Sequence, residues 1–233
     1  MGDSVKSAVR PAVKVPPGTL PFAAAAVGEC EGRRPRGRPA GRCATRDDLV
    51  QAGIGIFTEQ GFASTGIDAV LREVGVPKGS FYHYFASKEE FGLAVIDGYA
   101  RHYDDKLARQ FGDARIAPLD RFGGFLVEAR RGMRKHGFRK GCLVGNLGQE
   151  FGCAHEMFAK RLAAVLKGWQ RVVGACLREA QAAGELAATA DVDKLAKLFW
   201  IGWEGAVMRA RLERSSRPLD IFMEFYLAQL RPT

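Results

Sequence analysis

Apolar positions follow a helical period through most of the chain. Side chains three and four residues apart share one helix face, and this spacing recurs from residue 45 onward. No stretch of useful length alternates apolar and polar residues as a strand would. The pattern therefore predicts an all-α protein. Helices are expected at about residues 45–61, 64–75, 78–85, 87–109, 118–136, 143–151, 156–184, 191–212 and 218–230.

The ends of the first helices carry local signals. Thr45 can cap the first helix, with Asp47 and Asp48 in its first turn to complement the helix dipole. Gly61 and Gly75 are placed to end the first and second helices. Three helices with a tight turn between the second and third are typical of a DNA-binding unit, and we assign them to residues 45–90.

Residues 76–90 combine a turn, a short aromatic helix and a new helix start. Pro77 pre-sets a turn, after which Tyr82 and His83 should lie on the exposed face of the third helix. Ser87 and Glu90 have the spacing of a capping box that begins the next helix. The opposite, buried face should hold Phe81, Tyr84 and Phe85.

Positive charge is concentrated at the N-terminus. Residues 1–46 carry nine Lys and Arg against three acids, which is +6 of the net +9 of the 233-residue chain. Proline-rich residues 1–44 show no helical period and are expected to be a disordered basic tail. Arg36 and Arg38 belong to an Arg-Gly-Arg-Pro sequence resembling an AT-hook, which fits the minor groove of A·T-rich DNA. A solvated leader explains residues 1–30 equally well.

Composition and motifs limit the possible classes of protein. No apolar run approaches the ~20 residues of a membrane span. The five cysteines have no C-x-x-C spacing, so neither a disulfide framework nor a metal site is expected, and the protein should be cytoplasmic. The four histidines form no H-E-x-x-H, and neither paired catalytic carboxylates nor a phosphate loop stands out. We expect no enzyme and no cofactor.

Residues 139–151 are the first candidate for a sensing site. Cys142 stands near a helix N-terminus after Arg139 and Lys140, a setting that can lower a thiol pKa and make it reactive. Alternatively, Cys142 is a small buried apolar residue. Nearby aromatic residues could wall a ligand pocket or simply form core, with Asn146 and Arg130 as candidate polar contacts. These aromatic residues are Trp169, Trp200, Trp203, Phe122, Phe125 and Phe151.

The last two helices have enough apolar surface for a subunit interface, although they could also only complete the monomer core. The interface candidates are Val207, Leu212, Phe222, Phe225 and Tyr226.

Residues 45–90 resemble the helix-turn-helix domain of the TetR family of transcriptional regulators. The sequence Lys78-Gly79-Ser80-Phe81-Tyr82-His83-Tyr84-Phe85, followed by Ser87-Lys88, carries this resemblance. It implies that the third helix lies in the major groove and that residues 91–233 form a ligand-binding and dimerisation domain. The DNA contacts it implies are Ser64, Thr65, Lys78, Gly79, Ser80, Tyr82, His83 and Lys88.

Residues 45–230 also resemble the branch of this family that contains electrophile-sensing and acrylate-responsive repressors. Residues 141–150, 179–186 and 199–206 carry that resemblance. In the electrophile sensor, the cysteine matching Cys142 is partnered by a lysine, whose place we assign here to Met208 or its neighbours. The resemblance implies a homodimeric repressor, released from a palindromic operator by an acrylate-like or electrophilic inducer. Two alternatives stay open: a thiol sensor acting through Cys142, and a regulator that acts through a protein partner without a small ligand.

Overall fold

The computed structural model describes residues 45–151 and 155–231, and every regular element in them is helical. No strand occurs in these ranges, so the expected all-α class is confirmed. Residues 1–44, which include Arg36 and Arg38, lie outside the described residues. The elements are α1 (Arg46–Gln60), α2 (Ile67–Val74), α3 (Lys78–Tyr84), α4 (Lys88–Phe111), η1 (Pro118–Asp120), α5 (Arg121–Lys135), α6 (Leu143–Phe151), α7 (Glu156–Ala182), α8 (Val192–Glu213) and α9 (Arg217–Leu230).

Helix starts follow the predicted capping residues, with one difference. The Thr45 side chain accepts a hydrogen bond from Asp48 N at 3.2 Å, and the Asp48 carboxylate accepts from Thr45 N at 3.0 Å. Ser87 accepts from Glu90 N at 3.1 Å, but the Glu90 carboxylate accepts from Ala86 N at 2.8 Å. The second hydrogen bond of the predicted capping box of α4 therefore comes from the backbone N–H of Ala86 instead of that of Ser87.

Helices α1, α2 and α3 pack around a cluster of phenylalanines that we call the head cluster. Neighbouring rings lie with centroids 5.0 to 5.6 Å apart, mostly edge to face. Gly75 ends α2 in the left-handed conformation with φ of 75°, as its sequence position predicts. The head cluster consists of Phe57, Phe62, Phe81, Phe85 and Phe91.

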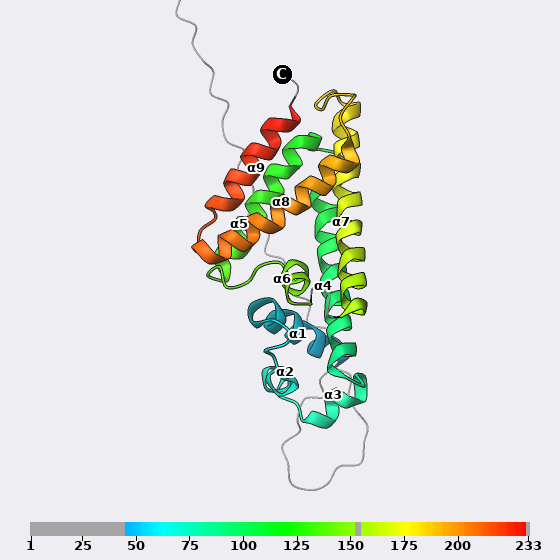
Figure 1. Ribbon diagram of the computed structural model, residues 1–233, viewed down its shortest axis with the longest axis vertical. Coiled ribbons are helices and arrows are strands. Elements are labelled where there is room, and N and C mark those ends of the chain that lie inside the picture. The colour runs from blue at the N-terminus through cyan, green and yellow to red at the C-terminus, as the bar shows by residue number, and fades with distance from the viewer. Residues whose placement is uncertain (1–44, 152–154, 232–233) are drawn as a thin grey trace, which may run out of the picture. The chain divides into compact units, whose positions relative to one another are not determined.

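Helix α4 joins the head to the remaining helices (Figure 1). Its first turn supplies Phe91 to the head cluster, and further along it packs against α7 and α5. Helix α8 packs against both α7 and α9. None of the described helices is long and apolar enough to cross a membrane.

A second aromatic cluster, the core cluster, lies among α5, α7 and α8. Trp169 and Trp200 have ring centroids 5.0 Å apart, and Phe125 and Trp203 have centroids 4.7 Å apart. This cluster differs from the head cluster because its three indoles and the neighbouring phenols of α4 carry hydrogen-bonding groups. The core cluster consists of Phe125, Trp169, Phe199, Trp200 and Trp203.

Candidate functional site

The exposed face of α3 is the candidate DNA-reading surface. Phe81 is fully buried, whereas the neighbouring Tyr82 is 50% exposed. The other predicted contacts of this helix are also accessible, with Lys78, Gly79 and His83 exposed and Ser80 half-buried. Helix α3 therefore presents the expected polar residues on the side opposite its aromatic anchor. Their contacts with DNA stay predictions.

The two predicted hydroxyl contacts before α2 are placed differently from the sequence expectation. Thr65 is buried, and its hydroxyl donates to Gly61 O at 2.7 Å. The exposed Ser64 hydroxyl donates to Gln60 O. The N-cap of α2 is Gly66, so both hydroxyls turn back onto the end of α1. The prediction of a phosphate contact through the Thr65 side chain disagrees with this burial.

Lys88, at the start of α4, is partly engaged by the head itself. Its ammonium nitrogen lies 4.3 Å from the centroid of the Phe62 ring, which is a cation–π distance. The side chain is half-buried. A phosphate contact by Lys88, which stays a prediction, would draw on a cation already positioned against the head cluster.

Cys142 lies directly before α6 in an interior setting. It is 7% exposed, and burial, followed by the nearby Glu204 carboxylate, raises its pKa well above the usual value. Hydrogen bonds from Gly145 N–H and the Tyr99 hydroxyl act in the opposite direction and do not reverse the shift. The alternative of a thiol with lowered pKa is wrong for this structure, and the small buried apolar residue describes it better.

The α8 residue that faces Cys142 is Glu204, whereas Met208 is 40% exposed. A Cβ atom at Gly145 would lie 2.0 Å from Glu204 Oε2, so the carboxyl group rests directly on the first turn of α6. Burial raises the pKa of Glu204 to about 7, and the hydrogen bond from Cys142 lowers it by a smaller amount. The match of Met208 or its neighbours to the lysine of the electrophile sensor stays a prediction, and the α8 group beside Cys142 is the Glu204 carboxyl.

Tyr99 and Tyr103 of α4 connect the Cys142–Glu204 pair to the core cluster. Their rings stack with centroids 5.5 Å apart, and the Tyr103 ring lies 4.8 Å from Trp169. Burial, followed by the proximity of Cys142, raises the pKa of both phenols well above their usual value. Trp169 Nε1 donates to Asp104 Oδ1 at 3.0 Å, whereas Trp200 Nε1 is buried without a hydrogen-bond partner among the described residues.

Asn146 lies on α6 and joins other parts of the chain. Its Nδ2 donates to Thr58 O at 2.9 Å, and its Oδ1 accepts from Arg211 Nη1 at 2.9 Å. Both ends of the amide are thereby occupied. The prediction that Asn146 contacts the ligand is not supported by this pairing; it links α1, α6 and α8.

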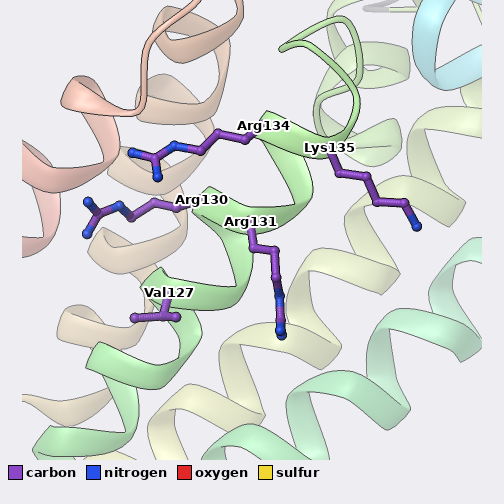
Figure 2. Close-up of a pocket in the computed structure, with 5 residues that line it drawn as sticks. All are labelled: Val127, Arg130, Arg131, Arg134 and Lys135. Atoms are coloured by element: carbon purple, nitrogen blue, oxygen red, sulfur yellow. The ribbon is translucent and has the colours of Figure 1, made fainter. Parts of the chain in front are cut away.

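Arg130 was predicted as a polar contact of the ligand, and the structure shows which groups surround it. It lines an open pocket of about 580 Å³ on α5 with Val127, Arg131, Arg134 and Lys135. Figure 2 shows Arg130 and Arg134 extending to one side of α5 and Arg131 and Lys135 to the other. Arg130 Nε lies 3.4 Å from Asp220 Oδ1 of α9. Its guanidinium therefore stabilises the α5–α9 contact.

The predicted interface residues divide between the surface and the interior. Leu212 and Phe225 are 74% and 66% exposed, and Phe222 is half-buried. Val207 and Tyr226 are buried within the chain, and the Tyr226 hydroxyl donates to Leu195 O at 3.0 Å. These last two residues belong to the core of the chain. Other exposed apolar side chains of α8 and α9 are Leu198, Ile201, Met208 and Ile221.

The predicted tryptophans do come together, with Phe125 beside Trp203 and Phe122 packed against Phe199. Phe151 packs elsewhere, against Phe158 at 4.3 Å and Phe62 at 5.1 Å. Sequence reasoning missed Glu204, although an acid on the same face as Trp200 was a usable signal. It also missed Glu150, whose carboxylate accepts hydrogen bonds from the backbone of Phe62 and Ala63.

Two family models match the chain. Residues 49–95 match "Bacterial regulatory proteins, tetR family", and residues 118–226 match "Tetracyclin repressor-like, C-terminal domain". The first range contains the rest of the head after its initial turn, and the second contains the core cluster. The family resemblance noted in the sequence is thus confirmed in both halves.

Individual relatives agree with the family models. The transcriptional regulator AcuR of Cereibacter sphaeroides is 50% identical over 81% of this chain and 86% of its own length. The repressor NemR of Escherichia coli is 27% identical over 76% of this chain and 88% of its own. A crystal structure of a TetR regulatory protein from Rhodobacter sphaeroides matches with a TM-score of 0.77 and 48% identity, covering 79% of this chain and 97% of that one. All are regulators of transcription, in agreement with the expectation that the chain is not an enzyme.

Proposed function

Because the chain belongs to the TetR family of DNA-binding transcriptional regulators, we propose that it is a repressor released from its operator when a small molecule binds its helical core. The ligand would be acrylate-like or electrophilic, and the binding region would lie around the core cluster. The exposed face of α3 would read the major groove, with Tyr82 and His83 at its centre.

Helix α6 carries this proposal because it links the core cluster region to the head. At its start, Cys142 and Gly145 meet Glu204. At its end, the Glu150 carboxylate accepts hydrogen bonds from Phe62 N at 2.9 Å and from Ala63 N. These two amides lie in the turn between α1 and α2, so one nine-residue helix spans both regions.

The hydrogen bond that Glu150 accepts from Phe62 N is partly buried and the one from Ala63 N is exposed. Hydrogen bonds to a charged group contribute about 1.5–3 kcal/mol at most, and a coupling energy between two sites is usually about 1–3 kcal/mol. A ligand that moves the start of α6 would strain the Glu150 bonds and shift α2 and α3. The connecting helix α4 offers a second route, since it begins directly after α3 and carries Tyr99 and Tyr103.

A homodimer would present two copies of α3 to a palindromic operator. Exposed apolar residues recur at helical spacing on α8 and α9, next to each other in the fold. A continuous apolar surface of this kind is typical of an interface. We assign the interface to Leu198, Ile201, Met208, Leu212, Ile221 and Phe225. A DNA-binding repressor of this kind would act in the cytoplasm.

The burial of Cys142 argues against the thiol-sensor alternative. A thiolate is the reactive form of cysteine, and burial raises the pKa of this thiol. We therefore place ligand binding before any thiol chemistry. Cys142→Ser should still bind DNA and still release it with a reversible inducer, whereas loss of all release would favour the thiol sensor.

The test begins with a duplex selected by the protein from random DNA, labelled for fluorescence anisotropy. Acrylate, its coenzyme A ester and N-ethylmaleimide are then titrated against the bound complex. We expect at least one of them to weaken DNA binding by about 5–150-fold. If none changes the affinity, the chain is a regulator without a small ligand of these classes.

Glu150→Ala tests whether α6 transmits the signal. We expect this variant to bind the operator within a few-fold of wild type, while the effect of the inducer on DNA affinity falls by about tenfold. Gln149→Ala, an exposed neighbour on the same helix, is the matched control and should respond as wild type does. Full release in Glu150→Ala would exclude α6 as the route.

A further inference from the structure

Two polar atoms inside the core lack any hydrogen-bond partner among the described residues. They are Trp200 Nε1 and Glu204 Oε1. A third such atom, Asp220 Oδ1, lies 3.4 Å from Arg130 Nε and so has a charged neighbour. Native interiors leave few polar groups unpaired, and each of those that remain calls for an explanation such as a bound molecule.

The two unpaired atoms belong to one face of α8. Residues 200 and 204 are four apart on the helix, so their side chains are neighbours. Glu204 Oε2 rests on Gly145 at the start of α6, and the Trp200 ring lies 5.0 Å from Trp169. One turn of α8 thus carries a buried, unpaired N–H donor within the aromatic cluster and a buried, unpaired carboxyl oxygen beside the start of α6.

The charges around Glu204 limit what it can bind. The titratable groups that face it are Tyr99 and Tyr103 from α4 and Cys142 before α6. Within the described chain, no basic side chain contributes to the pKa of Glu204, which burial raises to about 7. The carboxyl group is therefore present in both neutral and ionised forms near neutral pH, and no cation stands ready to pair with a second anion.

Trp200 and Glu204 can both donate hydrogen bonds to a ligand carboxylate only when Glu204 is protonated. The Trp200 N–H donates to a ligand oxygen in every state. Neutral Glu204 has an O–H that can donate to a second ligand oxygen, whereas ionised Glu204 would repel the ligand. We propose that Trp200 and Glu204 bind the carboxylate of a small monocarboxylic acid, and that the protein takes up a proton as this acid binds.

This proposal rests on the proposed function, because it specifies the polar end of the inducer site. It also gives the ligand a way to act on α6. A carboxylate that draws the Glu204 side chain away from Gly145 removes one contact between α8 and the start of α6. The same helix ends at Glu150, which holds the turn of the head.

The experiment is calorimetric titration of the full chain with propionate, a saturated acid that cannot alkylate Cys142. Titrations at about pH 6 and about pH 8 should give a Kd about tenfold weaker at the higher pH, because the neutral fraction of Glu204 falls by that factor. Repeating them in two buffers of different ionisation enthalpy should show uptake of close to one proton per site at about pH 8. A Kd that does not change with pH would overturn the proposal.

Two variants separate the roles of the two groups. Glu204→Gln carries a permanent N–H donor, so its Kd should be the same at both pH values and its proton uptake should vanish. Trp200→Phe keeps the ring but loses the donor, so binding should weaken by about tenfold at both pH values. Glu213→Gln changes an exposed carboxylate on the same helix that pairs with Arg209, and should behave as wild type.

Circular dichroism confirms folding first; if Glu204→Gln does not fold, Trp200→Phe and the wild-type titrations decide. Equal binding of uncharged propionamide and propionate at both pH values would identify a neutral carbonyl ligand and overturn the proposal. Binding of propionate that leaves operator affinity unchanged would contradict the proposed function but keep this site. If another inducer releases the DNA but propionate binds at neither pH, the proposed function stands and this carboxylate site is wrong.

Discussion

The head cluster and the core cluster are both built from closely packed rings, but they differ in polarity. The head cluster consists only of phenylalanines, whose rings offer neither donors nor acceptors. The core cluster contains Trp200, and Tyr99, Tyr103 and Glu204 lie beside it. A purely apolar cluster fixes one arrangement of α1, α2 and α3, whereas a cluster with unpaired polar atoms can gain energy from a ligand. The comparison suggests a rigid DNA-reading unit and a responsive core.

The largest effect should come from opening the head cluster. Phe81 is fully buried, with ring centroids 5.4 Å from Phe85 and 5.2 Å from Phe91, so Phe81→Ala should cost about 3–5 kcal/mol of unfolding free energy. Tyr82→Ala, one residue later on the exposed face, should leave the midpoint of urea unfolding nearly unchanged and abolish operator binding in a gel shift. Similar stability losses in both variants would refute the rigid head, and unchanged affinity in Tyr82→Ala would remove it from the DNA surface.

The next largest effect on stability should come from the ionisation of Glu204 in the core. The pKa of Glu204 rises from 4.5 to about 7 on folding, so the folded state binds more protons between these values. Stability should therefore be greatest below about pH 4.5 as far as this group is concerned, fall as pH rises, and level off above about pH 7. The full change is at most about 3 kcal/mol.

Urea unfolding of wild type and Glu204→Gln across this pH range measures that contribution. The difference between the two proteins should change by a few kcal/mol, with wild type losing stability relative to the variant as pH rises. A difference that stays constant from about pH 5 to about pH 8 would show that Glu204 is hydrated or paired with a cation.

The smallest effect tests the contact between α6 and α8. Gly145→Ala places a methyl group where Glu204 Oε2 now lies, so the carboxyl group must move; because alanine also gains helix propensity, the net cost should be about 1 kcal/mol in thermal or urea unfolding. Gly148→Ala, on the same helix but with open space around it, should be neutral or slightly stabilising. Combining Gly145→Ala with Glu204→Ala should recover part of the loss, and strict additivity would mean that the two residues do not touch.

Local signals allowed much of the fold to be predicted from the sequence. Helical spacing of apolar residues and the caps at Thr45 and Gly75 depend on neighbours within one or two turns, so they can be seen along the chain. The sites were less predictable because they depend on distant residues. Glu150 and Phe62 are 88 positions apart, and nothing in either local pattern indicates their hydrogen bond.

The errors share that physical origin. For Arg130, nothing in the sequence indicated its ion pair with Asp220, and its contact with a ligand stays a prediction. Val207 and Tyr226 are apolar or aromatic on the correct helices, yet the turn of each helix directs them inward. Thr65 has the right hydroxyl, and the loop before α2 buries it. The residue types indicated plausible roles, but the direction in which each side chain points could be seen only in the folded structure.

The contact between Gly145 and Glu204 should affect how these two positions change in evolution. A Cβ atom at position 145 would lie 2.0 Å from Glu204 Oε2, so a side chain there requires the Glu204 carboxyl group to move. Lineages that keep the acid should keep the glycine, and those that abandon the acid become free to place a side chain there. The two positions are therefore expected to change together, as a coupled pair.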